Sequence, residues 1–366
     1  MFTEKSRLSL KRTIYSVMLD GKDLVLLCTP CEPVVLKELS PFRRELLILL
    51  DGRRTAGEIM QELNARGHRC IFSKVREELD RLDEWLLLEE EGDAPLPEDT
   101  EHAGRNDRTR LWFAARRTSG ASFARQAERD LQSAHIVLFG LGGLGSQLFT
   151  QLLLTGIGEI TAVDCEKVEE SNLNRQSLFY ESNVGRLKTE AAAERARLMN
   201  SSASIHFVDK RIASAGDFAS LMAPASLALL AADTPRDMIF DWMNEASYTT
   251  GVPVLYSNGV LQSSMGIGPL VIPGRTACYQ CSMPEGARFE DPLVEQINRR
   301  HCHGVILPPL AMCAGLMVLE LVRHLTGCEP CRIYDRRLHM DFRNYRMWFQ
   351  DIEKRRSCPF CEQRAP

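Results

Sequence analysis

A glycine-rich turn between a predicted strand and a predicted helix constrains the fold of this chain more than any other feature. The apolar segment 135–139 (HIVLF) leads into Gly140-Leu-Gly142-Gly143-Leu-Gly145, and a helical pattern begins at once. Glycines let the backbone approach a phosphate closely, and the N-terminus of the helix favours the anion. Asp164 ends the next predicted strand, where its carboxylate can bind a ribose hydroxyl. The turn predicts a nucleotide site, and by itself it favours a dinucleotide over ATP.

Strand and helix patterns alternate through the rest of the chain. Predicted helices at 144–155 and 187–199 lie between short apolar strands. This alternation is typical of a doubly wound parallel sheet with helices on both faces. We therefore expect an α/β fold with a Rossmann-like domain over residues 111–366. The predicted strands are 135–139, 159–164, 204–209, 227–231 and 253–257.

Two cations and a carboxylate follow the glycine turn at predicted strand ends or helix starts. Arg175 lies in the segment after Asp164, and Lys188 stands at the head of the next helix. Two cations beside the turn suit a triphosphate better than the pyrophosphate of NAD. Asp233 ends a later strand across the same crevice, where it could bind Mg²⁺. Each residue alone could be a surface charge, but their convergence on one turn favours an ATP site.

The order and spacing of these motifs resemble the ThiF/MoeB/ubiquitin-activating family of adenylating enzymes. The resemblance rests on the glycine turn, on the segment from Asp164 to Gln176, on a lysine thirteen residues after Arg175, and on Asp233. It extends over about residues 108–363 and implies a homodimer that uses ATP to form acyl-adenylates. The resemblance also implies that an arginine of the partner subunit completes the site. Arg110 matches that motif best, and Arg116 stands at an equally plausible distance.

The same resemblance implies a role for each matching residue. Gly142 and the neighbouring glycines would hold the phosphates, and Asp164 would bind the ribose. Asp233 would bind Mg²⁺. The residues implied to contact the phosphates, or to lie near them, are Asn172, Arg175, Gln176 and Lys188.

Twelve cysteines include four C-x-x-C pairs, at 28/31, 278/281, 328/331 and 358/361. Two such pairs can supply the four thiolates of a closed, structural zinc site. On spacing alone several combinations are open, and the family resemblance implies Cys278, Cys281, Cys358 and Cys361. Cys302 and Cys313 stand alone, and the sequence does not decide whether either thiol is catalytic.

The first 91 residues predict a separate α+β domain. Alternating apolar residues flank Asp20-Gly21-Lys22 in a hairpin over 14–29, and Val34, Val35 and Leu36 form a third strand. Three helices follow, over 42–50, from Thr55 with a capping box, and over 73–85. Three strands and three helices predict a winged-helix-like domain, and polar residues 92–110 predict a linker.

Charge argues against a nucleic-acid partner for this domain. Between Ser73 and Asp93 nine acidic residues outnumber three basic ones, and the whole chain carries a formal charge of −4. The pattern L-D-G-x-x-T-x-x-E-I at 50–59 resembles PqqD-type domains, which recognise leader peptides by strand addition. The resemblance implies a peptide groove between strand 34–36 and the third helix, with Val34, Val35, Leu36, Val75 and Leu79. A dimerisation or stabilising role is the alternative.

The combination of domains resembles peptide-maturation enzymes of the microcin C and pantocin A type. We therefore expect ATP-dependent adenylation of a carboxylate or carboxamide on a ribosomally made precursor peptide that is captured by its leader. Cyclisation or a related modification in antibiotic biosynthesis would follow. The alternatives are adenylation of a sulfur-carrier protein and a non-catalytic leader-binding scaffold. The sequence shows no secretory signal and no apolar run near the length of about 20 residues that spans a membrane, so we expect a cytoplasmic protein.

Overall fold

The computed structural model describes residues 2–27, 32–90, 103–117, 120–236, 238–261, 263–284, 292–298 and 304–362. The chain divides into two compact units, Met1–Arg129 and Asp130–Pro366. The predicted linker covered 92–110, but its residues 103–110 belong to helix α4 (Ala103–Ala114). Helix α5 (Gly120–Ser133) follows and crosses the division between the units.

Before α4, the described part of the N-terminal unit contains two three-stranded antiparallel sheets and three helices. One sheet has the order β5-β1-β6, and the other has the order β2-β3-β4. The strands are β1 (Arg7–Leu10), β2 (Tyr15–Leu19), β3 (Asp23–Leu27), β4 (Val34–Leu36), β5 (Asp51–Thr55) and β6 (Leu88–Glu90). The helices are α1 (Pro41–Leu49), α2 (Ala56–Ala65) and α3 (Phe72–Glu84).

The strands and helices that local sequence patterns predict in this unit are present in the structure. The hairpin forms as β2 and β3, β4 covers the predicted third strand, and all three helices occur. At the start of α2, Thr55 accepts a hydrogen bond from the Glu58 amide at 3.2 Å and Glu58 accepts one from the Thr55 amide at 2.8 Å. This capping box satisfies two amides that the helix leaves without partners. The sheet β5-β1-β6 was not predicted, because it pairs residues far apart in the sequence, such as Leu8 with Glu90.

The core of the N-terminal unit corrects one part of the predicted peptide groove. Val75 and Leu79 of α3 have no exposed surface and pack in the core with Leu8, Leu26 and other aliphatic side chains. Their spacing of four residues marks the inner face of an amphipathic helix. A peptide on the surface cannot contact them, so they are core residues and not groove residues.

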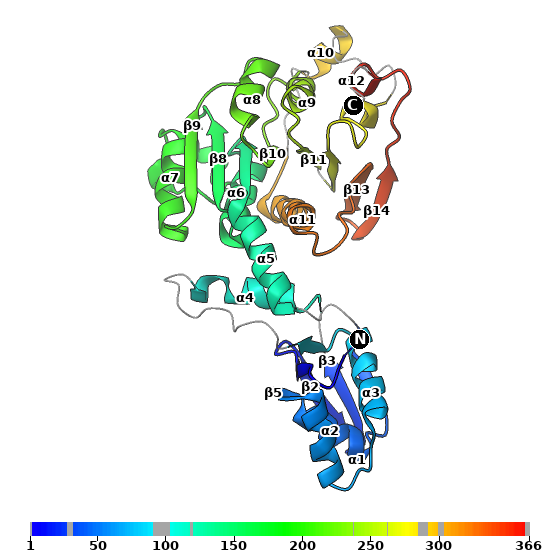
Figure 1. Ribbon diagram of the computed structural model, residues 1–366. Coiled ribbons are helices and arrows are strands. Elements are labelled where there is room, and N and C mark those ends of the chain that lie inside the picture. Colours follow the sequence, from blue (N-terminus) through cyan, green and yellow to red (C-terminus); the bar gives the residue numbers. More distant parts are fainter. Residues whose placement is uncertain are drawn as a thin grey trace. The chain divides into compact units, whose positions relative to one another are not determined.

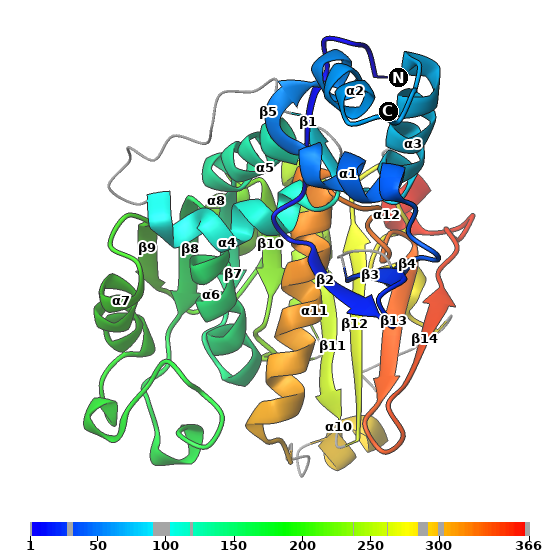
Figure 2. The same ribbon diagram turned by 90° about the horizontal axis from the view of Figure 1, so that it is seen from below.

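The C-terminal unit is built on one eight-stranded sheet with the order β14-β13-β12-β11-β10-β7-β8-β9 (Figure 2). The five strands from β11 to β9 are parallel, and β12, β13 and β14 extend the sheet in antiparallel pairs. The strands are β7 (His135–Phe139), β8 (Glu159–Asp164), β9 (Ser204–Asp209), β10 (Leu227–Leu230), β11 (Val254–Leu261), β12 (Ser264–Val271), β13 (Arg336–Asp341) and β14 (Arg346–Asp351).

Helices cover both faces of this sheet, as expected for a doubly wound fold. Figure 1 shows α6 and α11 on one face and α8 and α9 on the other. The α-helices of this unit are α6 (Gly143–Thr155), α7 (Lys188–Met199), α8 (Ala215–Met222), α9 (Ile239–Thr250), α10 (Pro292–Asn298), α11 (Leu307–Thr326) and α12 (Pro359–Glu362). The short 3₁₀ turns are η1 (Glu170–Asn172), η2 (Glu181–Asn183) and η3 (Gln280–Ser282).

The predicted α/β fold class and its five parallel strands are confirmed. β7, β8 and β9 have the predicted limits, β10 ends one residue earlier, and β11 continues to Leu261. Parallel strands are buried on both faces, so their apolar runs are visible in the sequence. The antiparallel strands β12, β13 and β14 were not predicted.

Helix α11 has the length and composition of a membrane span, with a mean hydropathy of 1.3 over its best window. This apolar segment of 20 residues was not predicted from the sequence. Half of that window is buried, and the helix packs on β11, β12 and α6. Glu320 is buried on it and forms an ion pair with Arg323 at 2.5 Å. These contacts explain the apolar composition as that of a core helix.

Candidate nucleotide site and zinc centre

The glycine turn joins β7 to α6 in a conformation that excludes side chains at two positions. Gly140 has φ +98°, and a Cβ there would lie 2.7 Å from the amide nitrogen of Ala232. A Cβ at Gly145 would overlap the carbonyl oxygen of Gly140. At Gly142, in contrast, a Cβ would meet no described atom within 4 Å. The packing of the chain itself therefore requires glycine at 140 and 145. Gly142, in contrast, leaves open space at the start of α6.

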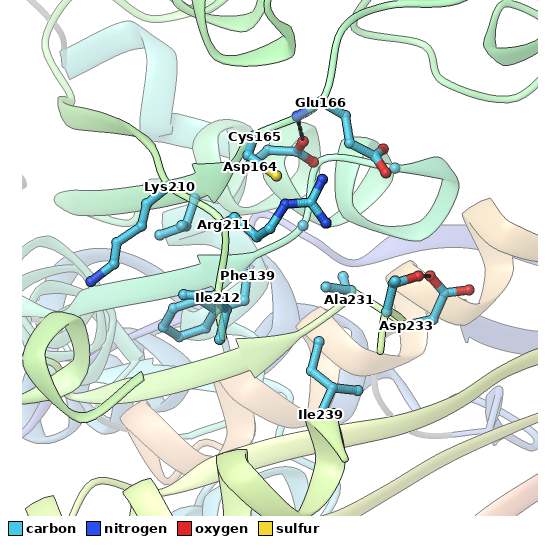
Figure 3. A pocket seen from close by; sticks show the side chains of 15 residues that line it. Phe139, Asp164, Cys165, Glu166, Lys210, Arg211, Ile212, Ala231, Asp233 and Ile239 are labelled. Carbon is cyan, nitrogen blue, oxygen red and sulfur yellow. Dashed lines mark hydrogen bonds between the residues drawn. The ribbon is translucent and has the colours of Figure 1, made fainter. Parts of the chain in front are cut away.

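A pocket of about 120 Å³ lies beside this turn, at the carboxyl ends of β7, β8, β9 and β10 (Figure 3). Doubly wound proteins bind ligands at this edge of the sheet. The lining residues come from each of the four strand ends and from the start of α9: Phe139, Gly140, Gly142, Val163, Asp164, Cys165, Glu166, Lys210, Arg211, Ile212, Ala231, Ala232, Asp233, Thr234 and Ile239.

Asp164 is held at the pocket by two backbone amides. Its Oδ2 accepts a hydrogen bond from the Leu141 amide at 2.7 Å, and its Oδ1 accepts one from the Glu166 amide at 2.8 Å. The first bond ties the carboxylate to the glycine turn. Each carboxylate oxygen retains a further lone pair, so Asp164 can still accept a hydrogen bond from a ligand hydroxyl.

Lys188 begins α7 and is connected to the pocket through Glu166. The lysine is only 2% exposed, and its Nζ lies 2.5 Å from Oε2 of Glu166. The Glu166 side chain is 64% exposed and lines the pocket. A buried ammonium with an exposed carboxylate partner can exchange that partner for a phosphate without moving far.

Arg175 lies against the other side of the glycine turn. Its Cδ is 3.5 Å from the position that a Cβ on Gly143 would take. Its Nη1 donates to the Ser171 carbonyl at 2.6 Å and to Oδ1 of Asn174 at 2.9 Å, and both acceptors are neutral. Among the described residues, the guanidinium therefore forms no ion pair, while its aliphatic stem contacts the turn.

The two amides of the same segment are buried. Asn172 is 7% exposed, and its Oδ1 accepts a hydrogen bond from the Glu169 amide at 3.2 Å. Gln176 is 3% exposed, and its Oε1 has no hydrogen-bond partner among the residues that the structure describes. Asn172 thus shapes the loop, while Gln176 keeps an acceptor that is not used within the chain.

Asp233 follows β10 and faces solvent across the pocket. Its side chain is 65% exposed, and its Oδ2 lies 3.4 Å from Nη2 of Arg236. Figure 3 shows it opposite Asp164 and Glu166. The two oxygens of an exposed carboxylate at this edge are ligands of the type that Mg²⁺ prefers.

Two cations of the pocket were missed by the sequence analysis. Lys210 and Arg211 follow directly after β9, and both line the pocket. Lys210 is paired with Asp217 at 2.7 Å, whereas the Arg211 guanidinium points into the pocket between Glu166 and Asp233 (Figure 3). The signal was available, because residues after the third predicted parallel strand must reach the same edge as those after the first two.

Four cysteines come together between the end of β12 and α12. The Sγ atoms of Cys278, Cys281, Cys358 and Cys361 all lie within 4.8 Å of one another. Three of the separations are 3.8, 3.4 and 3.6 Å. Thiolates around a tetrahedral zinc at about 2.3 Å lie about 3.8 Å apart, so the set fits structural zinc. This is the one metal-type cluster found among the described residues, and it agrees with the combination implied by the family.

The remaining cysteines are poorly suited to nucleophilic catalysis. Burial raises the pKa of Cys313 to about 11, and burial also raises the pKa of Cys165 beside the pocket. Burial raises the pKa of Cys331 to about 12. A neutral thiol is a weak nucleophile. Cys28, Cys31 and Cys302 lie outside the described residues.

Arg110 belongs to α4, in the N-terminal unit, and is already paired. Its Nε lies 2.7 Å from Glu128, and its Nη1 lies 3.4 Å from Asp107. The residue is 8% exposed. Its contribution to the site of a partner subunit stays a prediction.

The predicted peptide-binding strand lies at a sheet edge. β4 pairs with β3 and, among the described strands, has no partner on its other side. Val35 is 45% exposed, Val34 is half-buried, and Leu36 is buried in the core. The strand therefore offers backbone groups and one exposed apolar side chain, and Leu36 contributes to the core.

Known proteins resemble both the sequence and the fold. The chain is 30% identical over 210 residues to the sulfur carrier protein ThiS adenylyltransferase of Bacillus subtilis, a match over 56% of this chain and 58% of that protein. The chain thus spans little more than half the length of that relative. The E. coli MccB structure with ATP superposes with a TM-score of 0.81 at 20% identity, over 97% of this chain and 99% of that one.

A second solved structure shares the fold, and a family model covers most of the chain. The PaaA structure superposes with a TM-score of 0.71 at 21% identity, over 94% of this chain and 100% of that one. The model of the ThiF family matches residues 115–362, which include the glycine turn, the pocket and all four clustered cysteines. The chain therefore belongs to the ThiF family.

Proposed function

We propose that this chain is an ATP-dependent adenylyltransferase that activates a carboxylate or carboxamide on a ribosomally made precursor peptide. The observation that carries the proposal is the pocket at the glycine turn. It joins open space at Gly142 to the carboxylates of Asp164 and Asp233, with Lys188 connected through Glu166. In a ThiF-family chain, this set supports ATP as the substrate.

The reaction would begin with attack of a substrate oxygen on the α-phosphorus of ATP. The P–O bond to the β-phosphate breaks, pyrophosphate leaves, and an acyl-adenylate or its amide equivalent remains. Negative charge develops on the phosphate oxygens during this step, so cations held close to them lower the barrier. Lys188 and Arg175 are the cations that would stabilise this charge. Asp164 would bind the ribose, and Oε1 of Gln176 would be available as a hydrogen-bond acceptor.

Asp233 is the residue that would hold Mg²⁺. The cation, when bound, would neutralise charge on the phosphates. The exposure of Asp233 supports this role, since among the described residues its carboxylate has two long contacts, to Arg236 and to Thr234, each at 3.4 Å. We also propose that the four clustered cysteines hold a structural zinc.

Two observations support a peptide as the acceptor. Solved structures of E. coli MccB, which has the same fold, were obtained with the peptide MccA. In this chain, β4 is an edge strand with Val35 exposed, and an added strand could pair with it through backbone hydrogen bonds. We propose that β4 binds the leader of the precursor, so that the core of the peptide reaches the pocket at high effective concentration.

The later steps would belong to peptide natural-product biosynthesis. A nucleophile on the peptide would displace AMP from the activated group, which closes a ring or makes a related modification. We further propose a homodimer and a cytoplasmic location. A role for Arg110 in the partner's site would require it to leave Glu128.

A second candidate function is activation of a sulfur-carrier protein. The relative from Bacillus subtilis is named for that activity, and it would use the same ATP residues. A scaffold that only binds leaders is disfavoured, since such a protein has no need for the set Asp164, Lys188 and Asp233.

Pyrophosphate exchange into ATP tests the proposal. The acceptors to compare are a short precursor peptide encoded beside the gene and a sulfur-carrier protein that ends in Gly-Gly. We expect exchange with the peptide only, and its loss in Asp233→Ala. Exchange with the carrier alone would favour the second function, and exchange in Asp233→Ala equal to the wild type would disprove the assigned site.

A further inference from the structure

One arginine of the C-terminal unit is buried with no carboxylate beside it among the residues that the structure describes. Arg337 on β13 is 5% exposed. Its Nε donates to the Gly268 carbonyl at 3.2 Å, and its Nη2 donates to Oγ of Ser282 at 3.0 Å. Among the residues that the structure describes, no carboxylate lies within 4 Å of it. Burial lowers its pKa, as expected for a charge removed from water.

A half-buried arginine, Arg323, and a buried one, Arg110, show what is missing at Arg337. Arg323 lies 2.5 Å from Glu320 and 2.6 Å from Glu329. Arg110, in the other unit, lies 2.7 Å from Glu128. A buried guanidinium normally has such a partner, because an uncompensated charge in the interior is costly. Arg337 has two neutral acceptors for five N–H donors, so it can still bind an anion.

Arg337 lies near the same edge of the sheet as the candidate nucleotide pocket, the edge formed by the carboxyl ends of the parallel strands. The parallel register of β10 and β11 pairs Leu229 with Leu255, so Asn258 on β11 stands as far along its strand as Ala232 of the pocket does. A Cβ built on Gly266 of β12 would lie 3.4 Å from Cβ of Asn258 and 3.5 Å from Cδ of Arg337. The three residues therefore share one face of the sheet.

Gly266 lies between the two side chains and places no side chain of its own there. A Cβ there would make ordinary contacts, so the chain has no steric need for glycine at this position. Glycine inside a strand often marks a place where a ligand or another backbone approaches closely. Asn258 is exposed, so the face is open to solvent at its pocket side.

We infer that Arg337 binds a side-chain carboxylate of the acceptor peptide, with Gly266 and Asn258 forming the floor and the pocket-side wall. This inference rests on the proposed function, and it specifies the acceptor as an acidic peptide. β13 is three strands from β10, which is about 14 Å at a strand spacing of about 4.8 Å. That distance corresponds to about four residues of extended chain between the bound carboxylate and the activated group.

Binding of a defined probe to the full-length chain tests the inference. The probe is tetraglutamate, acetylated and amidated at its ends so that only side chains carry charge, and tetraglutamine is its neutral counterpart. Calorimetric titration of the wild type should show salt-dependent binding of the acidic peptide at least tenfold tighter than that of the amide peptide. Arg337→Met should lose at least tenfold in affinity for tetraglutamate, and Arg337→Lys should retain part of it.

Two further variants guard against a merely structural explanation. Arg336→Met removes the neighbouring arginine, which is exposed and paired with Asp351, and it should bind tetraglutamate as the wild type does. Gly266→Ala adds one methyl group at ordinary contact distance and should weaken binding without changing the melting temperature. If Arg337→Met does not fold, this variant decides the question.

The outcomes separate this inference from the proposed function. The inference is overturned if the wild type binds both peptides equally or binds neither. It is also overturned if Arg337→Met and Gly266→Ala leave the affinity for tetraglutamate unchanged. The ATP analogue AMPCPP is titrated in parallel, and its affinity should stay within twofold in every variant. Failure of the wild type to bind AMPCPP would count against the proposed function alone.

Discussion

Where the glycine turn borders the pocket, single residues both stabilise the local structure and face the space for a ligand. Asp164 accepts the Leu141 amide and thereby fixes the turn, and it also faces the space where a ribose would bind. Lys188 is buried at the same edge of the sheet and forms an ion pair with Glu166, which lines the pocket. Local structure and ligand binding therefore depend on the same atoms.

Asp164→Asn should weaken ATP binding by at least about tenfold, which matches the loss of one hydrogen bond to a charged acceptor. The amide would place an N–H donor where one of the two backbone amides now donates, so the turn would also lose a partner. Titration with AMPCPP measures the effect. Asp209→Asn, at the end of the neighbouring strand β9 and opposite Asp164 in register, is the matched control and should bind normally. Equal affinities in the two variants would contradict the role of Asp164.

Cys313 should make the stability of the chain depend on pH in the alkaline range. Burial raises its pKa from 9.0 to about 11, so the unfolded chain loses the thiol proton first as the pH rises. The free energy of unfolding should fall between pH 9 and 11. Denaturant titrations of the wild type and of Cys313→Ala should show a steeper fall in the wild type. Parallel curves would mean that Cys313 is not buried as described.

Residues at the ends of predicted strands could be identified from the sequence, because the sheet rule brings them to one edge. Asp164 and Asp233 illustrate this. Arg337 could not be identified, since its importance depends on burial and on the absence of a carboxylate neighbour among the described residues, and neither is encoded in local spacing.

At the scale of elements, the two clustered C-x-x-C pairs connect the segment after β12 to the segment after β14. Cys278 is buried and precedes η3, whereas Cys358 precedes α12. Tyr248 of α9 lies 3.6 Å from Cys361, so a core helix also contacts the cluster. The cluster therefore supports packing on the α9 face of the sheet.

Cys281→Ser should release the metal and lower the melting temperature. Zinc content should fall from about one ion per chain to well below half, as measured by mass spectrometry. Loss of a few kcal/mol should lower the melting temperature by about 5–10 °C. Cys331→Ser alters another C-x-x-C pair and should keep both the metal and the melting temperature. Zinc loss in Cys331→Ser, or none in Cys281→Ser, would contradict the assignment.

The strands that could be predicted are those buried on both faces. β7 and β10 are continuous apolar runs, and their sequences are readable without any tertiary information. β14 is exposed at every position, and β13 mixes arginines with apolar residues, so neither shows a strand period. β13 pairs with β12 and β14 pairs with β13, and a local pattern cannot show either contact.

At the scale of the whole molecule, the chain combines a unit with an open sheet edge and a unit with a nucleotide pocket. The proposed function requires both, since the first would select the peptide and the second would activate it. A substitution in the first unit should therefore affect the use of the peptide without affecting the nucleotide.

Val35→Asp should raise the KM for the precursor peptide at least about tenfold and leave the affinity for AMPCPP unchanged. The carboxylate would be buried by an added strand and would remove an apolar contact. Val17→Asp is the matched control, because Val17 lies on the far strand of the same sheet and is exposed to a similar extent, 38% against 45%. Equal effects of the two variants would place the leader elsewhere.

The four-cysteine cluster, with the zinc proposed for it, would close a loop between Cys278 and Cys358, 80 positions apart, that contains α11, β13 and β14. A ribosome makes all of these elements before it makes the second knuckle. The proposed metal site would therefore stay incomplete, and the antiparallel half of the sheet would lack its metal, until Cys358 and Cys361 have left the ribosome. In a cell short of zinc, newly made copies would stop at this point and would be open to proteases, whereas copies already closed would persist. Metal supply would thus control the abundance of the protein through the degradation of newly made copies and not through activity.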